Sequence, residues 1–238
     1  MKSRAVNFDP IARPYRWLEY LSFGPFLERC RFHYLGRLAC SRRALILGDG
    51  DGRFAAKLLA SNPEITVDAV DSSSAMLALL SSRVSALGPT AKRRLRTIRS
   101  DAQDFHPQGE HYDLVVTHFF LDCLHEEEVR ILIASMTPNL APDALWLISE
   151  FSIPGHQPAA FFCKLVVGSL YRIFRLATGL RVRRLPEYAP RLEEAQFSLR
   201  SCRKWLGGLL TSELWRYEAR YKATASGSAT SHQQRYYR

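Results

Sequence analysis

The sequence predicts an α/β fold with a doubly wound, mostly parallel sheet, N-terminal helices and a C-terminal β-hairpin. Three observations predict it. An apolar run at 44–47 stops at a turn with three glycines spaced two apart, and helix-forming residues follow. Further apolar strands then alternate with helical segments up to about residue 151. The length of 238 residues and the 47% hydrophobic content suit one such domain with a full core.

Charge, cysteine content and hydropathy indicate the partners and the cellular location to expect for the protein. The net charge of +10 suits a solvated surface, an anionic membrane surface, nucleic acid or an acidic substrate. The five cysteines are scattered and form no CxxC pair, so we expect reduced thiols and no metal site. The basic start is not followed by an apolar signal segment, and no run is apolar enough to span a membrane. We expect a cytoplasmic protein, with peripheral association with the inner face of the membrane as an alternative.

The lead-in, residues 1–40, carries apolar residues at helical spacing that Gly24-Pro25 interrupts. We expect two or three short helices there. They either pad one edge of the sheet or form a lid over a ligand, with Tyr15 near it.

The segment 41–151 reads as the ligand-binding core. Strands are predicted, in chain order, at about 43–47, 65–71, 94–99, 112–117 and 144–151. Helices are predicted after the glycine turn, from Ser73 onward with Ser72 or Ser73 as N-cap, and over about 126–136. Gly88-Pro89 is expected to stop the second helix, and Pro142-Asp143 to form a turn before the last strand.

The remaining chain breaks this alternation. Residues 161–180 predict one long helix, apolar except for a narrow, partly basic stripe. This inserted segment, 152–185, is either core, a cap over the substrate or a membrane contact. A helix at 186–196 and a hairpin around Gly207-Gly208 complete a single domain, 1–222, and we expect the tail 223–238 to be disordered.

The carboxyl ends of the predicted strands carry the polar residues. Ligands bind at these ends in open α/β sheets. The glycine turn, Asp71, Asp101 and the 118–122 segment all lie there. Asp71 follows the glycine turn by about twenty residues, where an acid accepts hydrogen bonds from ribose hydroxyls.

The turn itself argues against a dinucleotide. The dinucleotide fingerprint needs a third glycine where Arg53 stands. Asp49 and Asp51 line the turn, and two carboxylates would repel a pyrophosphate. A ligand that carries an ammonium and a sulfonium suits them better, and S-adenosylmethionine is such a ligand.

From about residue 44 to 151 the sequence resembles the class I S-adenosylmethionine-dependent methyltransferases. The matching stretches are the glycine turn Leu47–Phe54, Val70-Asp71-Ser72 with Met76, Ser100-Asp101-Ala102, and Tyr112–Phe120. More loosely, Phe8–Tyr15 resembles the start of quinone-biosynthesis-type methyltransferases.

The resemblance implies a cofactor, S-adenosyl-L-methionine, and a role for each stretch. The glycines would face its methionine part, Asp71 its ribose, and Asp101 with Ala102 its adenine. The full expected set of cofactor-binding residues is Tyr15, Gly48, Asp49, Gly50, Asp51, Gly52, Asp71, Ser72, Met76, Asp101, Ala102, Thr117, His118 and Phe119. One departure is Ile46, which stands where the family often has an acid; Asp49 or Asp51 would take over its contacts, or the cofactor pose would differ.

Methyl transfer from a sulfonium is an in-line displacement, so the protein mainly aligns the reactants and excludes water. If the acceptor must lose a proton, His118 is the first candidate base and Asp122 the second. A wall or structural role is the competing interpretation for His118. The apolar 161–180 segment and the aromatic lead-in favour a small, apolar acceptor, quinone- or lipid-like.

Three other classes stay open. A nicotinamide-dependent, NAD(P)-type oxidoreductase would have to bind a dinucleotide despite Asp49, Asp51 and Arg53. A non-catalytic methyltransferase-like binding protein would fit the departure at Ile46. A nucleic-acid methyltransferase fits the charge, but no Asn-Pro-Pro-Tyr-type motif follows the fourth strand, so nucleic acid is not expected as a partner.

Overall fold

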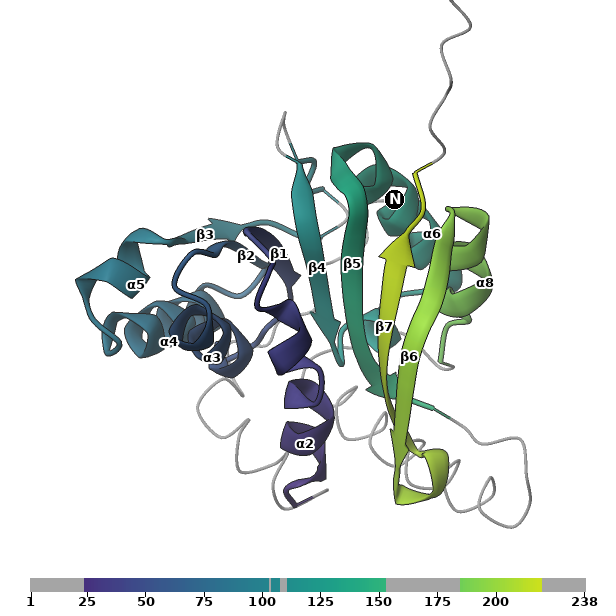
Figure 1. Ribbon diagram of the computed structural model, residues 1–238, viewed down its shortest axis with the longest axis horizontal. Helices are drawn as coiled ribbons and strands as arrows, with labels where there is room; N and C mark the ends of the chain where they lie inside the picture. The colour runs from purple at the N-terminus through teal and green to yellow at the C-terminus, as the bar shows by residue number, and fades with distance from the viewer. Residues whose placement is uncertain (1–23, 103, 108–110, 153–184, 220–238) are drawn as a thin grey trace, which may run out of the picture.

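The computed structural model describes residues 24–102, 104–107, 111–152 and 185–219. Their strands form one seven-stranded sheet of order β3-β2-β1-β4-β5-β7-β6 (Figure 1). The strands are β1 (Arg43–Leu47), β2 (Thr66–Asp71), β3 (Leu95–Arg99), β4 (Tyr112–His118), β5 (Leu140–Phe151), β6 (Phe197–Trp205) and β7 (Leu210–Tyr217). Strands β1 to β5 are parallel, and β7 runs antiparallel between β5 and β6. The predicted fold class and hairpin are confirmed.

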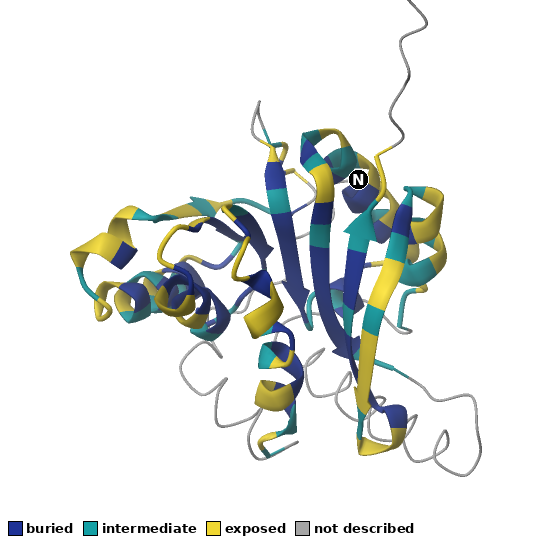
Figure 2. Cartoon of the chain, in the orientation of Figure 1, coloured by how far each residue is buried: buried dark blue, intermediate teal, exposed yellow. Residues whose placement is uncertain are grey.

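Helices cover both faces of this sheet. They are α2 (Phe26–Phe32), η2 (Leu35–Leu38), α3 (Arg53–Ser61), α4 (Ser74–Ser85), α5 (Pro89–Arg93), η3 (Leu121–Cys123), α6 (Glu126–Met136), η4 (Thr137–Asn139), α8 (Tyr188–Glu194) and η5 (Leu206–Gly208). One face packs mainly on α3 and α4 through a cluster that contains Phe54, and the other on α6 and α8 through a cluster that contains Trp146. The central strands are therefore buried along most of their length (Figure 2).

Two local expectations need correction. The helix α4 ends at Ser85, before Gly88, and Gly88 instead caps the short helix α5 that Pro89 begins, because proline suits the first turn of a helix. The expected turn at Pro142-Asp143 lies inside β5, which begins at Leu140. The β5 backbone is nevertheless irregular there, because its pairing with β4 shifts register and Asp143 has φ 62°.

Several expectations fall outside the described residues. Tyr15, the quinone-type lead-in motif, the 161–180 segment and the tail from 223 belong to this group, and they stay predictions. Of the expected lead-in helices, α2 and η2 lie in the described part, and α2 begins directly after Pro25. No helix in the described ranges is both long and apolar enough to cross a membrane.

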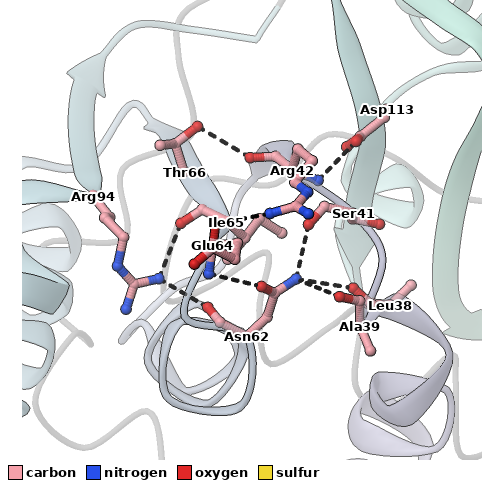
Figure 3. A network of polar contacts seen from close by, with 10 residues as sticks. All are labelled: Leu38, Ala39, Ser41, Arg42, Asn62, Glu64, Ile65, Thr66, Arg94 and Asp113. Carbon is pink, nitrogen blue, oxygen red and sulfur yellow. Dashed lines mark hydrogen bonds and ion pairs between the residues drawn. The ribbon is translucent and has the colours of Figure 1, made fainter.

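The amino ends of β1 and β2 are held by a dense polar network (Figure 3). The Asn62 amide nitrogen donates to the carbonyls of Leu38, Ala39 and Ser41 at 2.8–3.2 Å. The Arg94 guanidinium donates to the backbone carbonyls of Leu59, Asn62 and Ile65. This network ties η2, α3 and β2 together at the edge opposite to the one where ligands are expected.

Candidate functional site

The strand order reverses between β1 and β4, and the carboxyl ends of strands at such a switch point are where open α/β sheets bind ligands. The two strands are neighbours, with Leu47 opposite Thr117. From β1 the chain leaves toward β2, and from β4 it leaves toward β5 on the other side. The glycine turn, the end of β2 and the segment after β4 therefore meet at one edge of the sheet, as the sequence predicts.

All three glycines of the turn adopt positive φ: Gly48 at 66°, Gly50 at 62° and Gly52 at 78°. Such values disfavour any other residue. At Gly48 and Gly52 the space of a Cβ atom is also taken by the protein itself. The ring of Phe120 fills it at Gly48, and Leu80 of α4 fills it at Gly52. The glycines are expected from the sequence to face a cofactor, whereas at these two positions side chains of the protein occupy the space.

The two aspartates of the turn have different environments. The carboxylate of Asp51 accepts from Arg53 Nε at 2.9 Å and from Arg83 at 2.8 Å, so two guanidinium groups neutralise it. Asp49 is 9% exposed, and its Oδ2 accepts from the backbone N–H of Ala55 at 2.8 Å. Its Oδ1 is buried without a hydrogen-bond partner among the described residues. Burial raises the pKa of Asp49 to about 7. The two carboxylates of the turn are therefore not equivalent, in contrast to the expectation, because Asp51 is paired with Arg53 and Arg83.

The end of β2 gathers the residues expected near ribose and adenine. Asp71 accepts from the backbone N–H of Ser73 at 2.8 Å, and Ser73 caps α4 by accepting from Met76 N at 3.1 Å. The predicted N-cap is thus confirmed as Ser73 rather than Ser72. The backbone N–H of Ser100 donates to the carbonyl of Asp71 at 3.2 Å. This bond joins the loop of Asp101 and Ala102 to the end of β2.

Within this group Asp71, Ser72 and Asp101 are half-buried, while Met76 and Ala102 are buried. The three polar residues therefore reach the surface of the edge and can contact a ligand. Met76 and Ala102 can form only an apolar wall there.

Thr117 and His118 point to opposite faces of the sheet, as alternation along a strand requires. The Thr117 hydroxyl accepts from the indole N–H of Trp146 at 3.1 Å in the core on the α6 side. Thr117 is fully buried, so its side chain has a structural role, in contrast to the expectation.

His118 packs edge-on against Phe54 on the other face, with ring centroids 4.5 Å apart. It is 4% exposed, and neither ring nitrogen has a hydrogen-bond partner among the described residues. Burial, with the charge of Arg31 as a smaller cause, holds the pKa of His118 well below its usual value. The imidazole is therefore neutral at pH 7. No hydrogen bond joins it to Asp122, the second candidate base.

The segment after β4 holds Phe119, Phe120 and Asp122. Phe119 has φ 52°, and its ring lies against Phe151 and under the guanidinium of Arg31. Asp122 is 8% exposed, and burial raises its pKa to about 6. This segment therefore supplies both aromatic surface and a second acid to the edge.

Sequence reasoning missed Glu150. It lies on β5 at 1% exposure, and its Oε1 accepts from the backbone N–H groups of Phe120 and Leu121. Burial and the nearby Asp122 raise its pKa well above the usual value. The signal was present as an acid at the end of an otherwise apolar strand. That strand end, however, was not counted among those that carry polar groups.

Comparisons with known proteins agree with this architecture. A family model described as a methyltransferase domain matches residues 45–146. A comparison with curated proteins finds no match. Many solved structures share the fold, and three illustrate it.

An O-methyltransferase family protein from Burkholderia thailandensis has a TM-score of 0.64 at 17% identity, with 92% of this chain and 65% of that chain covered. The pyocyanin biosynthetic protein PhzM has a TM-score of 0.63 at 17% identity, with 89% and 62% covered. The N-methyltransferase NodS from Bradyrhizobium japonicum WM9, in complex with S-adenosyl-L-homocysteine, has a TM-score of 0.56 at 18% identity, with 80% and 87% covered.

At these identities the likeness concerns the fold. The chain spans 60–65% of the length of the first four similar structures. Residues 45–146 match a methyltransferase domain, and the strand order and the glycine turn at the switch point agree with that match.

Proposed function

We propose that the protein transfers a methyl group from S-adenosylmethionine to a small, apolar acceptor that is quinone- or lipid-like. One observation carries the cofactor half of this proposal. The Oδ1 atom of Asp49 is a buried acceptor without a partner among the described residues, beside a glycine turn at the switch point. Buried acceptors in native proteins are otherwise nearly always paired, so a ligand donor fits there.

The ammonium group of the methionine part is the donor that suits Asp49. Asp71, half-buried at the end of β2, suits the ribose hydroxyls, and Asp101 with Ala102 suits the adenine. Asp51 has its charge neutralised by Arg53 and Arg83, so we assign it to shaping the turn rather than to the ligand.

Bound S-adenosylmethionine supplies an activated methyl group, and the chain's own residues do the rest. Phe54, Phe119 and Phe120 provide apolar walls that keep water from the reacting atoms. His118 is neutral, and neither ring nitrogen has a partner among the described residues, so the nitrogen that carries no hydrogen can accept a proton from the methyl acceptor. Asp122, with its pKa at about 6, is the alternative base.

The proposed class of methyl acceptor rests on the sequence of the 161–180 segment and on the solved structures that resemble this chain. The similar structures include proteins described as O- and N-methyltransferases. The basic stripe of the segment further suggests contact with an anionic membrane that holds the acceptor. Flotation with anionic liposomes tests this part. We expect the wild type to float and Arg172→Glu/Arg175→Glu to stay behind, and equal flotation would reject membrane contact.

The function as a whole is tested in two steps. Titration calorimetry should detect binding of S-adenosylhomocysteine and of S-adenosylmethionine to the protein, but no binding of NAD. Transfer of a labelled methyl group should then be measured on a panel of quinols, phenols and apolar amines. Binding of NAD alone would favour an oxidoreductase. Binding of S-adenosylhomocysteine without transfer to any compound on the panel would favour a non-catalytic binding protein.

A further inference from the structure

Glu150 is an acid in a place that strongly disfavours one. It lies near the end of β5, opposite Thr211 of β7, and is 1% exposed. By alternation it shares the sheet face of Trp146 and Ile148, both in the apolar cluster on the α6 side. Burying a carboxyl group among apolar residues is costly unless its hydrogen bonds are made. Its retention there therefore requires a reason.

The reason lies in the backbone that Glu150 contacts. Its Oε1 accepts from Phe120 N at 3.0 Å and from Leu121 N at 2.8 Å. These N–H groups follow the end of β4, where the chain turns away from the sheet through Phe119 in a left-handed conformation. Backbone donors at such a point lose their strand partners, and if left unpaired in the interior they destabilise the local structure.

The segment that Glu150 holds reaches the glycine turn. The ring of Phe120 occupies the space that a Cβ atom at Gly48 would need. One continuous chain of contacts thus runs from Glu150, through the backbone of residues 120 and 121, to the ring of Phe120 and the first glycine. Asp122 follows in the same segment, and its charge acts on Glu150.

We propose that Glu150 is a positioning residue for cofactor binding. It fixes the 119–122 segment so that the Phe120 ring forms a wall of the glycine turn. The inference rests on the proposed function, since the ligand of the turn is taken to be S-adenosylmethionine. Glu150 itself contacts no ligand in this account and acts through Phe120.

The first test compares Glu150→Gln with Glu150→Ala by titration with S-adenosylhomocysteine. Glutamine keeps an acceptor oxygen for the two N–H groups, so its Kd should stay within about threefold of wild type. Alanine leaves both donors unpaired, so its Kd should rise about 10- to 100-fold. Asp68→Asn is the matched control. It alters another buried acid, held by Arg43, Arg96 and Tyr112, and should lower Tm without changing this Kd.

A double-mutant cycle with Phe120→Leu separates positioning from general stability. If Glu150 acts through the ring, Glu150→Ala should add less than about twofold to the loss that Phe120→Leu causes alone. Full additivity, or an unchanged or tighter Kd in folded Glu150→Ala, would overturn the inference.

Hydrogen exchange of the unliganded protein gives an answer that does not depend on the ligand. The amides of Phe120 and Leu121 should exchange at least about tenfold faster in Glu150→Ala and at the wild-type rate in Glu150→Gln. Equal rates in both variants would overturn the inference. If the wild type failed to bind S-adenosylhomocysteine, the proposed function would fall, while the exchange rates would still decide whether Glu150 holds the segment.

Discussion

The two edges of the sheet treat buried polar groups differently. At the amino edge, Asn62 uses its amide nitrogen on three carbonyls and its oxygen on the backbone N–H of Glu64 (Figure 3). Arg94 donates to three more carbonyls, and only its Nε is unpaired among the described residues. At the carboxyl edge, Asp49 Oδ1 and both ring nitrogens of His118 are buried without a partner among the described residues.

This difference indicates which buried polar groups stabilise the fold and which are available to a ligand. A polar network whose members nearly all have partners stabilises the fold and has little left to offer a ligand. Unpaired buried groups are disfavoured by folding alone, so from their concentration at the switch point we infer that a ligand completes this edge.

The largest effect is expected at the amino edge, on stability alone. Asn62→Ala removes a donor from three carbonyls, of which, among the described residues, only that of Leu38 keeps another donor, the Ser41 N–H, and removes the acceptor of the Glu64 N–H. It should lower the free energy of unfolding by about 2–4 kcal/mol. Denaturant unfolding measures this. The affinity of the folded variant for S-adenosylhomocysteine should stay within about twofold, and a tenfold loss would contradict the separation of the two edges.

The next effect is on binding alone. Asp71→Ala removes the acceptor assigned to the ribose hydroxyls, and should weaken S-adenosylhomocysteine about 10- to 100-fold in calorimetry. Asp71→Asn keeps an oxygen at the same place and should lose less. Full affinity in Asp71→Ala would remove Asp71 from the cofactor site.

Asp49 predicts a pH dependence whose sign follows from its raised pKa of about 7. Near pH 6 the unliganded carboxyl is mostly protonated. A bound ammonium group would lower its pKa, so binding should release a proton, and affinity should rise from pH 5 to pH 8. Calorimetry in buffers of different ionisation enthalpy measures this release. Asp49→Asn should show neither the release nor the rise, and a wild-type affinity that falls with pH would refute the assignment.

The same pKa predicts the stability of the unliganded protein. Folding disfavours the ionised form of Asp49, so the wild type should lose stability as pH rises from about 4, the ordinary pKa of aspartate, to about 7. The loss should level off above that pH. Thermal unfolding of Asp49→Asn across the same range serves as the reference, and parallel curves would contradict the raised pKa.

The smallest effect is expected at Thr117. Thr117→Val keeps the shape but leaves the Trp146 indole N–H without its acceptor, at a cost of about 1–2 kcal/mol in unfolding free energy. Because the hydroxyl faces the core, the Kd for S-adenosylhomocysteine should change less than about twofold. A larger change would restore the cofactor role that the sequence suggests for Thr117.

The sequence predicts the fold well, because strong local signals agree with it. The apolar strands with their glycine and serine caps give β1, α4 and the hairpin nearly to the residue. The site is predicted less completely. Asp51 of the glycine turn pairs with Arg83 of α4, a tertiary contact that residue spacing does not predict. The Phe120 ring occupies the space of a Cβ atom at Gly48, and this contact depends on how the segment after β4 turns. The role of Glu150 is not predicted for the same reason, since its partners are backbone N–H groups 29 and 30 residues away.

We infer that a ligand completes the carboxyl edge of the sheet and not the amino edge. Hydrogen exchange with and without S-adenosylhomocysteine tests it directly. The account predicts added protection at 48–52, 71–76 and 118–122, with no change at 38–42 and 62–66. Protection confined to the amino edge, or no protection at a saturating concentration of S-adenosylhomocysteine, would contradict it.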